Sequence, residues 1–353
     1  MKFKFVLMLI MLCLFMAGVV MLPIASGEQV KEFEIVGTRL SDVADLKSLG
    51  SYPVLDSRGE IAGSFRPVGS QEERRYLVSL EGKVDFTIEP LTYLLASRNG
   101  NRLISYGGHV DHCTISKVSV SIYATNGVLV KSFDTDIWSP FALCAQDNGD
   151  FWIAGKNGYN GEAFTIRKYS SDGQLIWEDP LPTRAPMRLV LSLDNRYAGL
   201  VLYDQVTDNR EVRYYEGNGN LVREQVMPRF FHGIEFVSND KVVAYSGGEW
   251  ELYQLPEATR SIASGTFMGN PLGEHPITGL PGEDSFVIVT LGDETTLEGY
   301  RIQAIDAERG QVVAESLFDG SPFWQPYRFS WVTERGAVAL LIDENQIVEL
   351  EMR

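Results

Sequence analysis

The side chains best suited to bind a metal ion lie together in residues 107–113 (GGHVDHC). His109, Asp111 and His112 offer two imidazoles and one carboxylate, an N/O set that suits zinc or another transition metal. Ligands this close in sequence cannot surround an ion without help from elsewhere, and the sequence contains no second histidine cluster. We therefore expect ordinary loop residues here, and neither a metal nor another cofactor.

Four proline-containing segments carry aromatic side chains, cations or both. They are residues 138–141 (WSPF), 182–186 (PTRAP), 228–232 (PRFFH) and 322–327 (PFWQPY). An aromatic and guanidinium surface can hold a peptide, a sugar or a small anion by stacking and bidentate hydrogen bonds. The alternative is that the aromatics fill gaps and the prolines stiffen connections. The candidate ligand-binding residues are Trp138, Arg184, Arg229, His232, Trp324 and Tyr327.

Two cysteines, Cys113 and Cys144, lie outside the N-terminal segment. In an oxidising compartment they could form a single disulfide. The alternative is a pair of buried free thiols. Mass spectrometry of the non-reduced protein distinguishes the two.

Sequence signatures of catalysis are absent. The chain has no Gly-x-Ser-x-Gly elbow, no His-Glu-x-x-His, no Cys-x-x-Cys and no P-loop. This favours a binding protein. An enzyme, such as a hydrolase, a lyase or a quinone-dependent dehydrogenase, stays open as the alternative, because its site could be assembled from distant segments.

The elements that would position these residues repeat along the chain. Glycines 127, 173 and 219 each stand in a polar turn between two alternating runs, and both intervals are 46 residues (173 − 127 and 219 − 173). Asp-Gly or Asn-Gly between β-rich runs is a strong hairpin signal. A second family of polar turns begins at residues 56, 98, 147, 194, 238, 282 and 333. Interleaving the two families predicts units of four antiparallel strands.

The hairpin pattern resembles a known repeat. Its clearest copy, YSSDGQLIW at 169–177, is similar to the loose repeat of WD-repeat, YVTN-type and quinoprotein-like β-propellers, whose blades repeat every roughly 40 to 50 residues. The resemblance implies an all-β propeller, and the seven turns of the second family predict seven four-stranded antiparallel blades, with six blades as the alternative. The Trp-Asp pair of WD repeats is absent and Gly-His does not recur from unit to unit, so no site residue is carried over.

The first elements after the N-terminal segment complete this expectation. Residues 30–37 (VKEFEIVG) form an alternating run that predicts a strand, and residues 41–49 (SDVADLKSL) predict a brief helix. The last unit lacks a fourth strand, so we expect the run 30–37 to supply it and to close the ring. Trp177, at the end of the clearest hairpin, is expected to pack between blades rather than to contact a ligand.

The N-terminus resembles an export signal. Lys2 and Lys4 precede an apolar run at 5–22 and a small-residue exit, which predicts a signal peptide over 1–27 and a single propeller domain over 28–353. The run exceeds the usual roughly 7 to 15 residues, so an uncleaved membrane anchor is the alternative. The protein is thus expected in the periplasm or outside the cell.

The net charge of the chain restricts the classes of binding partner. A formal net charge of −16 argues against nucleic acid and anionic membranes. We expect a monomeric ligand-binding or protein-interaction scaffold, whose partner is a protein, a peptide, or a small anionic or carbohydrate ligand.

Overall fold

The computed structural model describes most of the chain after residue 29. The described residues are 30–40, 46–48, 54–55, 61–67, 74–79, 82–86, 93–97, 102–111, 114–124, 126–158, 163–227, 231–256, 260–271, 276–280, 285–292, 299–318, 329–332, 337–342 and 346–353. All regular secondary structure within these ranges is β-strand. The predicted signal peptide, residues 1–27, lies outside them. Among the described residues, no helix is long and apolar enough to cross a membrane.

Five consecutive segments of the chain each form a four-stranded antiparallel sheet. The first contains β7 (Tyr93–Ala96), β8 (Leu103–Asp111), β9 (Thr114–Tyr123) and β10 (Leu129–Asp134). The second contains β11 (Ile137–Ala145), β12 (Phe151–Asn157), β13 (Phe164–Tyr169) and β14 (Leu175–Leu181). The third contains β15 (Arg184–Leu191), β16 (Tyr197–Asp204), β17 (Asn209–Glu216) and β18 (Leu221–Met227). The fourth contains β19 (Phe231–Phe236), β20 (Lys241–Ser246), β21 (Glu249–Gln254) and β22 (Ala263–Thr266), and the fifth contains β23 (Ile277–Gly279), β24 (Ser285–Leu291), β25 (Tyr300–Asp306) and β26 (Gln311–Phe318).

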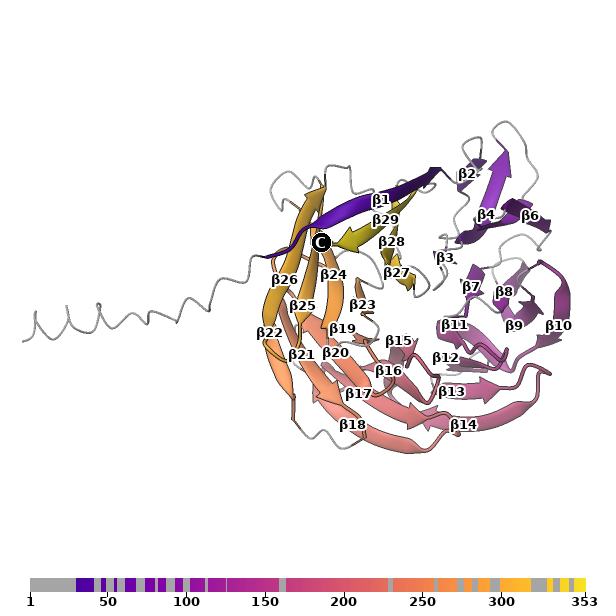
Figure 1. Cartoon of the computed structure of the whole chain (residues 1–353). Helices are drawn as coiled ribbons and strands as arrows, with labels where there is room; N and C mark the ends of the chain where they lie inside the picture. Colours follow the sequence, from indigo (N-terminus) through magenta and orange to yellow (C-terminus); the bar gives the residue numbers. More distant parts are fainter. Residues whose placement is uncertain are drawn as a thin grey trace, which may run out of the picture.

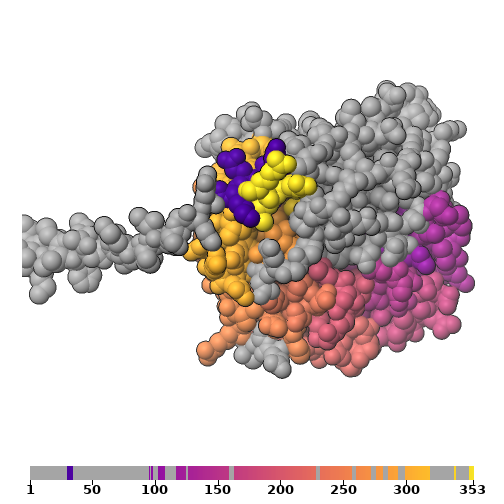
Figure 2. Space-filling view, viewed as in Figure 1, coloured from indigo at the N-terminus to yellow at the C-terminus, as the bar shows by residue number. Residues whose placement is uncertain are grey.

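The two ends of the chain share a sixth four-stranded sheet. It contains β27 (Phe329–Val332), β28 (Ala337–Ile342), β29 (Gln346–Met352) and, at its edge, β1 (Phe33–Leu40), which overlaps the strand predicted at 30–37. β1 pairs antiparallel with β29 from Phe33 opposite Met352 to Leu40 opposite Gln346. Figure 2 shows residues at the start of β1 in contact with the C-terminal residues. The predicted all-β class and the predicted four-stranded antiparallel units are confirmed by these six sheets.

A five-stranded sheet follows β1 and corrects the predicted helix. It contains β2 (Leu46–Ser48), β3 (Val54–Leu55), β4 (Ile61–Pro67), β5 (Arg74–Ser79) and β6 (Gly82–Phe86). The helix predicted at 41–49 is wrong where the chain is described, because β2 pairs with β4, with Lys47 opposite Arg66. A helix this short is marginal in water, and pairing along β4 satisfies the same backbone groups.

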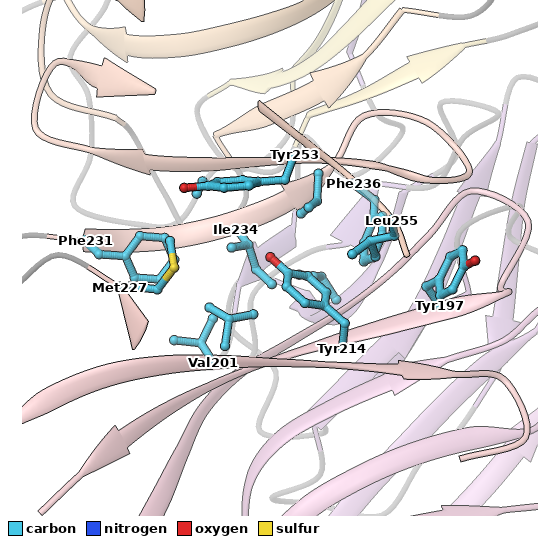
Figure 3. Packing of buried hydrophobic residues seen from close by; sticks show 13 residues of the cluster. Tyr197, Val201, Tyr214, Met227, Phe231, Ile234, Phe236, Tyr253 and Leu255 are labelled. Carbon is cyan, nitrogen blue, oxygen red and sulfur yellow. The ribbon is translucent and has the colours of Figure 1, made fainter. Parts of the chain in front are cut away.

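The sheets lie side by side, with the first strands β11, β15, β19 and β23 toward the middle and the last strands β14, β18, β22 and β26 outside (Figure 1). Neighbouring sheets pack face to face through apolar side chains. Figure 3 shows one such cluster, between the sheet β15–β18 and the sheet β19–β22. Its labelled members are Tyr197, Val201, Tyr214, Met227, Phe231, Ile234, Phe236, Tyr253 and Leu255. Burying each such side chain stabilises the fold by about 1.5 to 3 kcal/mol.

The repeated glycines are required by the contact between sheets. Gly173 and Gly219 have φ angles of 81° and 96°, in the left-handed region that favours glycine. A Cβ atom at Gly219 would lie 2.4 Å from the Trp177 ring of the preceding sheet. Trp177 also packs against Trp152 and Tyr215, with ring centroids 5.4 and 5.1 Å apart. The interpretation of Trp177 as a packing residue is confirmed.

Charged side chains on the outer hairpins repeat with the same interval. Arg167 of β13 lies 2.9 Å from Glu178 of β14, and Arg213 of β17 lies 2.8 Å from Glu224 of β18. The two pairs are 46 residues apart (213 − 167 and 224 − 178) and each pair is in cross-strand register. Asp179 joins the sheets, because it accepts hydrogen bonds from Arg213 and from the Tyr215 hydroxyl at 3.3 and 2.9 Å.

Candidate functional site

Three of the six predicted ligand-binding residues lie at one end of neighbouring inner strands. Arg184 is the first residue of β15, and Trp138 and His232 are the second residues of β11 and β19. The other three predicted residues, Arg229, Trp324 and Tyr327, lie outside the described residues. The binding surface predicted from this set therefore stays a prediction.

The Arg184 guanidinium is already paired with carboxylates. Its Nε lies 2.9 Å from Glu211 Oε2, and its Nη2 lies 3.6 Å from Glu224 Oε1. The Glu211 side chain is only 8% exposed, so this pair neutralises a carboxylate that would be costly to bury alone. Arg184 therefore stabilises its own sheet, and an anionic ligand would have to compete with two acids for it.

The predicted metal ligands are only partly within the described residues. His109 and Asp111 belong to β8, so the segment expected as a loop continues as a strand to Asp111. His112 and Cys113 lie outside the described residues. No group of three or more potential metal ligands occurs in the described part of the chain.

Cys144 of β11 is buried and forms no disulfide with another described residue. Burial raises the pKa of this thiol, so it is protonated and unreactive at neutral pH. Its predicted partner Cys113 is not described, so the disulfide stays a prediction.

A pocket of about 590 Å³ lies at the opposite ends of the inner strands, between the sheets β11–β14 and β15–β18. It is formed by the turns that follow β11 and β15 and by residues around the ends of β13 and β17. Because β15 has eight residues at about 3.3 Å each, this end lies roughly 25 Å from the end that carries Arg184. The lining residues are Gln146, Asp147, Asn148, Lys168, Asp194, Asn195, Arg196, Tyr197, Glu216, Gly217 and Asn218.

The two turns that form the pocket share one local structure. The side chains of Asn148 and Asp194 each accept a hydrogen bond from the backbone N–H two residues further on, at 2.9 and 3.0 Å. This is the Asx-turn that favours these residue types. The following residue is left-handed in both turns, Gly149 with φ of 92° and Asn195 with φ of 59°. Asparagine tolerates this conformation better than most residues, and here it adds a side chain where the neighbouring turn has none.

Asn195 connects the two sheets. Its Nδ2 donates to Asp147 Oδ2 at 3.0 Å, and its backbone oxygen accepts from Gln146 Nε2 at 3.3 Å. The bond to Asp147 fixes the orientation of the amide, because the reverse orientation would oppose two oxygens. Asn195 Oδ1 is then a buried acceptor with no hydrogen-bond partner among the described residues.

Lys168 places a buried ammonium group at the pocket. The residue is 8% exposed, and its Nζ donates to the Gly217 carbonyl at 2.8 Å. Asp150 Oδ2 lies 3.6 Å away, and the Trp152 ring centroid lies 5.7 Å from Nζ. An ammonium has three protons to donate, and within the described part of the chain Lys168 makes one hydrogen bond. The Lys168 ammonium can therefore donate further hydrogen bonds.

Charges of both signs surround the pocket. The acids are Asp147, Asp194 and Glu216, and the cations are Lys168 and Arg196. The Arg196 side chain is 66% exposed and lies over the Tyr197 ring at 5.3 Å. The lining is thus rich in donors and acceptors without a dominant charge.

Sequence reasoning identified both turns as hairpin connections and missed the pocket. Two signals were available: asparagine at the position where the preceding turn has Gly149, and a lysine inside the strand FTIRKY at 164–169. All six residues of that strand are buried. A lysine rarely occupies such a position without a specific partner.

No family model matches the chain, and no curated protein matches it.

Proposed function

We propose that the chain is an exported seven-bladed β-propeller that acts as a ligand-binding module. Support for the architecture comes from the 46-residue spacing of the turn glycines, the six four-stranded sheets and the pairing of β1 with β29. In this proposal the five-stranded sheet β2–β6 is the first blade, and β1 closes the ring in the last. Six blades remain the alternative. Export rests on the sequence of residues 1–27, and cleavage after Gly27 would be read from the mass of the mature protein.

The ligand in this proposal is small and polar and binds in the pocket between the second and third four-stranded sheets. The observation that carries the proposal is the pair of buried polar groups on this pocket whose hydrogen-bonding capacity is incompletely used, the Lys168 ammonium and the Asn195 amide oxygen. Buried polar groups are normally satisfied. A pocket of about 590 Å³ also falls within the roughly 300 to 1,000 Å³ of small-molecule sites.

The inner strands offer less support for the enzyme alternative. Arg188 of β15 donates to the Tyr245 hydroxyl at 2.8 Å and pairs with Glu235 of β19. Arg188 and Glu235 are mostly buried, with side chains 17% and 9% exposed. Because these groups bond to one another across two sheets, they are expected to hold the sheets together rather than to act on a substrate.

The test is a binding screen against a chemically mixed library of sugars, carboxylates, amines and nucleosides, read by thermal shift and confirmed by calorimetry. Asn195→Gly removes the amide and keeps a residue that tolerates a φ of 59°. Asn239→Ala, an exposed change in the turn between β19 and β20, is the matched control. We expect at least one library compound whose binding is lost in Asn195→Gly and kept in Asn239→Ala. Binding that is equal in both variants would refute the pocket as the site.

A further inference from the structure

We infer that the pocket between the sheets β11–β14 and β15–β18 takes a neutral, hydroxyl-rich ligand, a saccharide or a sugar-like polyol. The inference rests on the proposed binding function and narrows its ligand to one chemical class.

Charges of both signs line the pocket, so a ligand with a single charge of either sign is attracted by one set and repelled by the other. Asp147, Asp194 and Glu216 would repel a carboxylate or a phosphate. Lys168 and Arg196 would repel an amine, and the Lys168 ammonium is nine-tenths buried, where charge repulsion is screened little by water. A neutral ligand meets neither penalty.

The hydrogen-bonding groups favour hydroxyls in particular. Lys168 retains protons to donate, whereas Asn195 Oδ1 needs a donor. A hydroxyl both donates and accepts, so a ligand with several hydroxyls can satisfy groups of both kinds. Ligands with only acceptors or only donors would leave one of the two buried groups unsatisfied, at a free-energy cost.

The two sheets provide a rigid frame for such a ligand. Asp147 comes from the turn after β11 and Asn195 from the turn after β15, and their direct hydrogen bond of 3.0 Å holds the turns in register. The second bond between the turns, from Gln146 Nε2 to the Asn195 carbonyl, keeps the backbone of Asn195 in place. A frame fixed before binding costs little ordering entropy when the ligand enters.

The test is isothermal calorimetry with D-glucose, D-galactose, D-mannose, maltose, cellobiose and trehalose as neutral probes. Glucuronate and glucosamine serve as charged probes of the same shape. Wild type, Asn195→Gly and Asn239→Ala are compared, after circular dichroism melts have verified that all three fold. We expect at least one neutral sugar to bind, both charged analogues to bind more weakly, and Asn195→Gly to weaken binding about tenfold, the effect of one lost hydrogen bond.

Deoxy derivatives of the best sugar give a second readout that does not depend on protein variants. Removal of the hydroxyl that contacts the pocket should weaken binding to wild type and have a smaller effect on Asn195→Gly. If a charged library compound binds and depends on Asn195 while the neutral sugars do not, the ligand class is wrong and the binding proposal stands. If no sugar and no library compound depends on Asn195, both proposals fail.

Discussion

Two adjacent tyrosines in β17 allow the packing between sheets to be tested with a single atom. Tyr214 and Tyr215 are both fully buried, and burial raises the pKa of both hydroxyls, so both are neutral at pH 7. Their side chains point to opposite faces of the strand. The Tyr215 hydroxyl donates to Asp179 of the neighbouring sheet at 2.9 Å, whereas the Tyr214 hydroxyl has no partner among the described residues.

Replacement by phenylalanine should therefore have opposite effects at the two positions. Tyr215→Phe loses a hydrogen bond to a carboxylate that is 29% exposed, so we expect the protein to be less stable by about 1 to 2 kcal/mol. Tyr214→Phe removes a hydroxyl that is buried without a partner, so the change should be neutral or should stabilise by about 1 kcal/mol. The edge-to-face contact between the ring at position 214 and Phe236 is retained in Tyr214→Phe.

The assay is urea unfolding of the two variants and wild type, followed by intrinsic fluorescence and circular dichroism together. Coincident transitions would allow the free energies to be compared. The expected order of the midpoints is Tyr215→Phe lowest, with Tyr214→Phe equal to or above wild type. If Tyr214→Phe loses as much stability as Tyr215→Phe, the Tyr214 hydroxyl has a partner and the packing described between these sheets is incorrect.

Three further predictions concern glycine, pH and thiol reactivity. Gly219→Ala should lower the free energy of unfolding by at least about 2 kcal/mol more than Gly158→Ala. Both glycines have φ above 90°, but only a Cβ atom at Gly219 would collide with Trp177. Equal urea midpoints for the two variants would refute this contact. Burial raises the pKa of Tyr253 to about 12, with a hydrogen bond to Glu251 as a second cause. The native state thus holds this proton more tightly, and stability should be intact below pH 10 and fall as the pH rises toward 12. Tyr253→Phe should reduce this loss of stability in thermal melts between pH 10 and 12. An unchanged dependence of stability on pH would contradict the prediction. Cys144 should resist a thiol reagent at pH 8 in the native state and react after unfolding in urea with reductant, because burial raises its pKa; labelling of the native protein would disprove its burial.

The repeating hairpins could be predicted from sequence because their cause is local. The turns at Gly127, Gly173 and Gly219 require a left-handed residue between alternating runs, and all three have positive φ in the structure. Their common spacing then predicted four-stranded units. The helix predicted at 41–49 failed for the opposite reason, because a weak local propensity was overridden by pairing of Leu46–Ser48 with another strand.

The pocket could not be predicted because it depends on contacts between sheets. Asn195 meets Asp147 across a separation of 48 residues, and Lys168 meets the Gly217 carbonyl across 49. These sequence separations are longer than the 46-residue repeat. The offset between neighbouring sheets determines which turns come into contact. The placement of Arg184 at one end of its strand could be read from the repeat. Its pairing with Glu211 could not, because Glu211 lies two strands away in β17 and the registers of both strand pairs bring the two side chains together.

The most direct test of the central claim is an experimental structure of the protein with the tightest-binding neutral sugar of the calorimetric panel. The account predicts the sugar between the turns that follow β11 and β15, with hydroxyls at roughly 2.6 to 3.2 Å from Lys168 Nζ and from an acceptor on Asn195 or Asp147. A sugar bound at the other end of the inner strands, near Arg184, with the pocket containing only water, would contradict it.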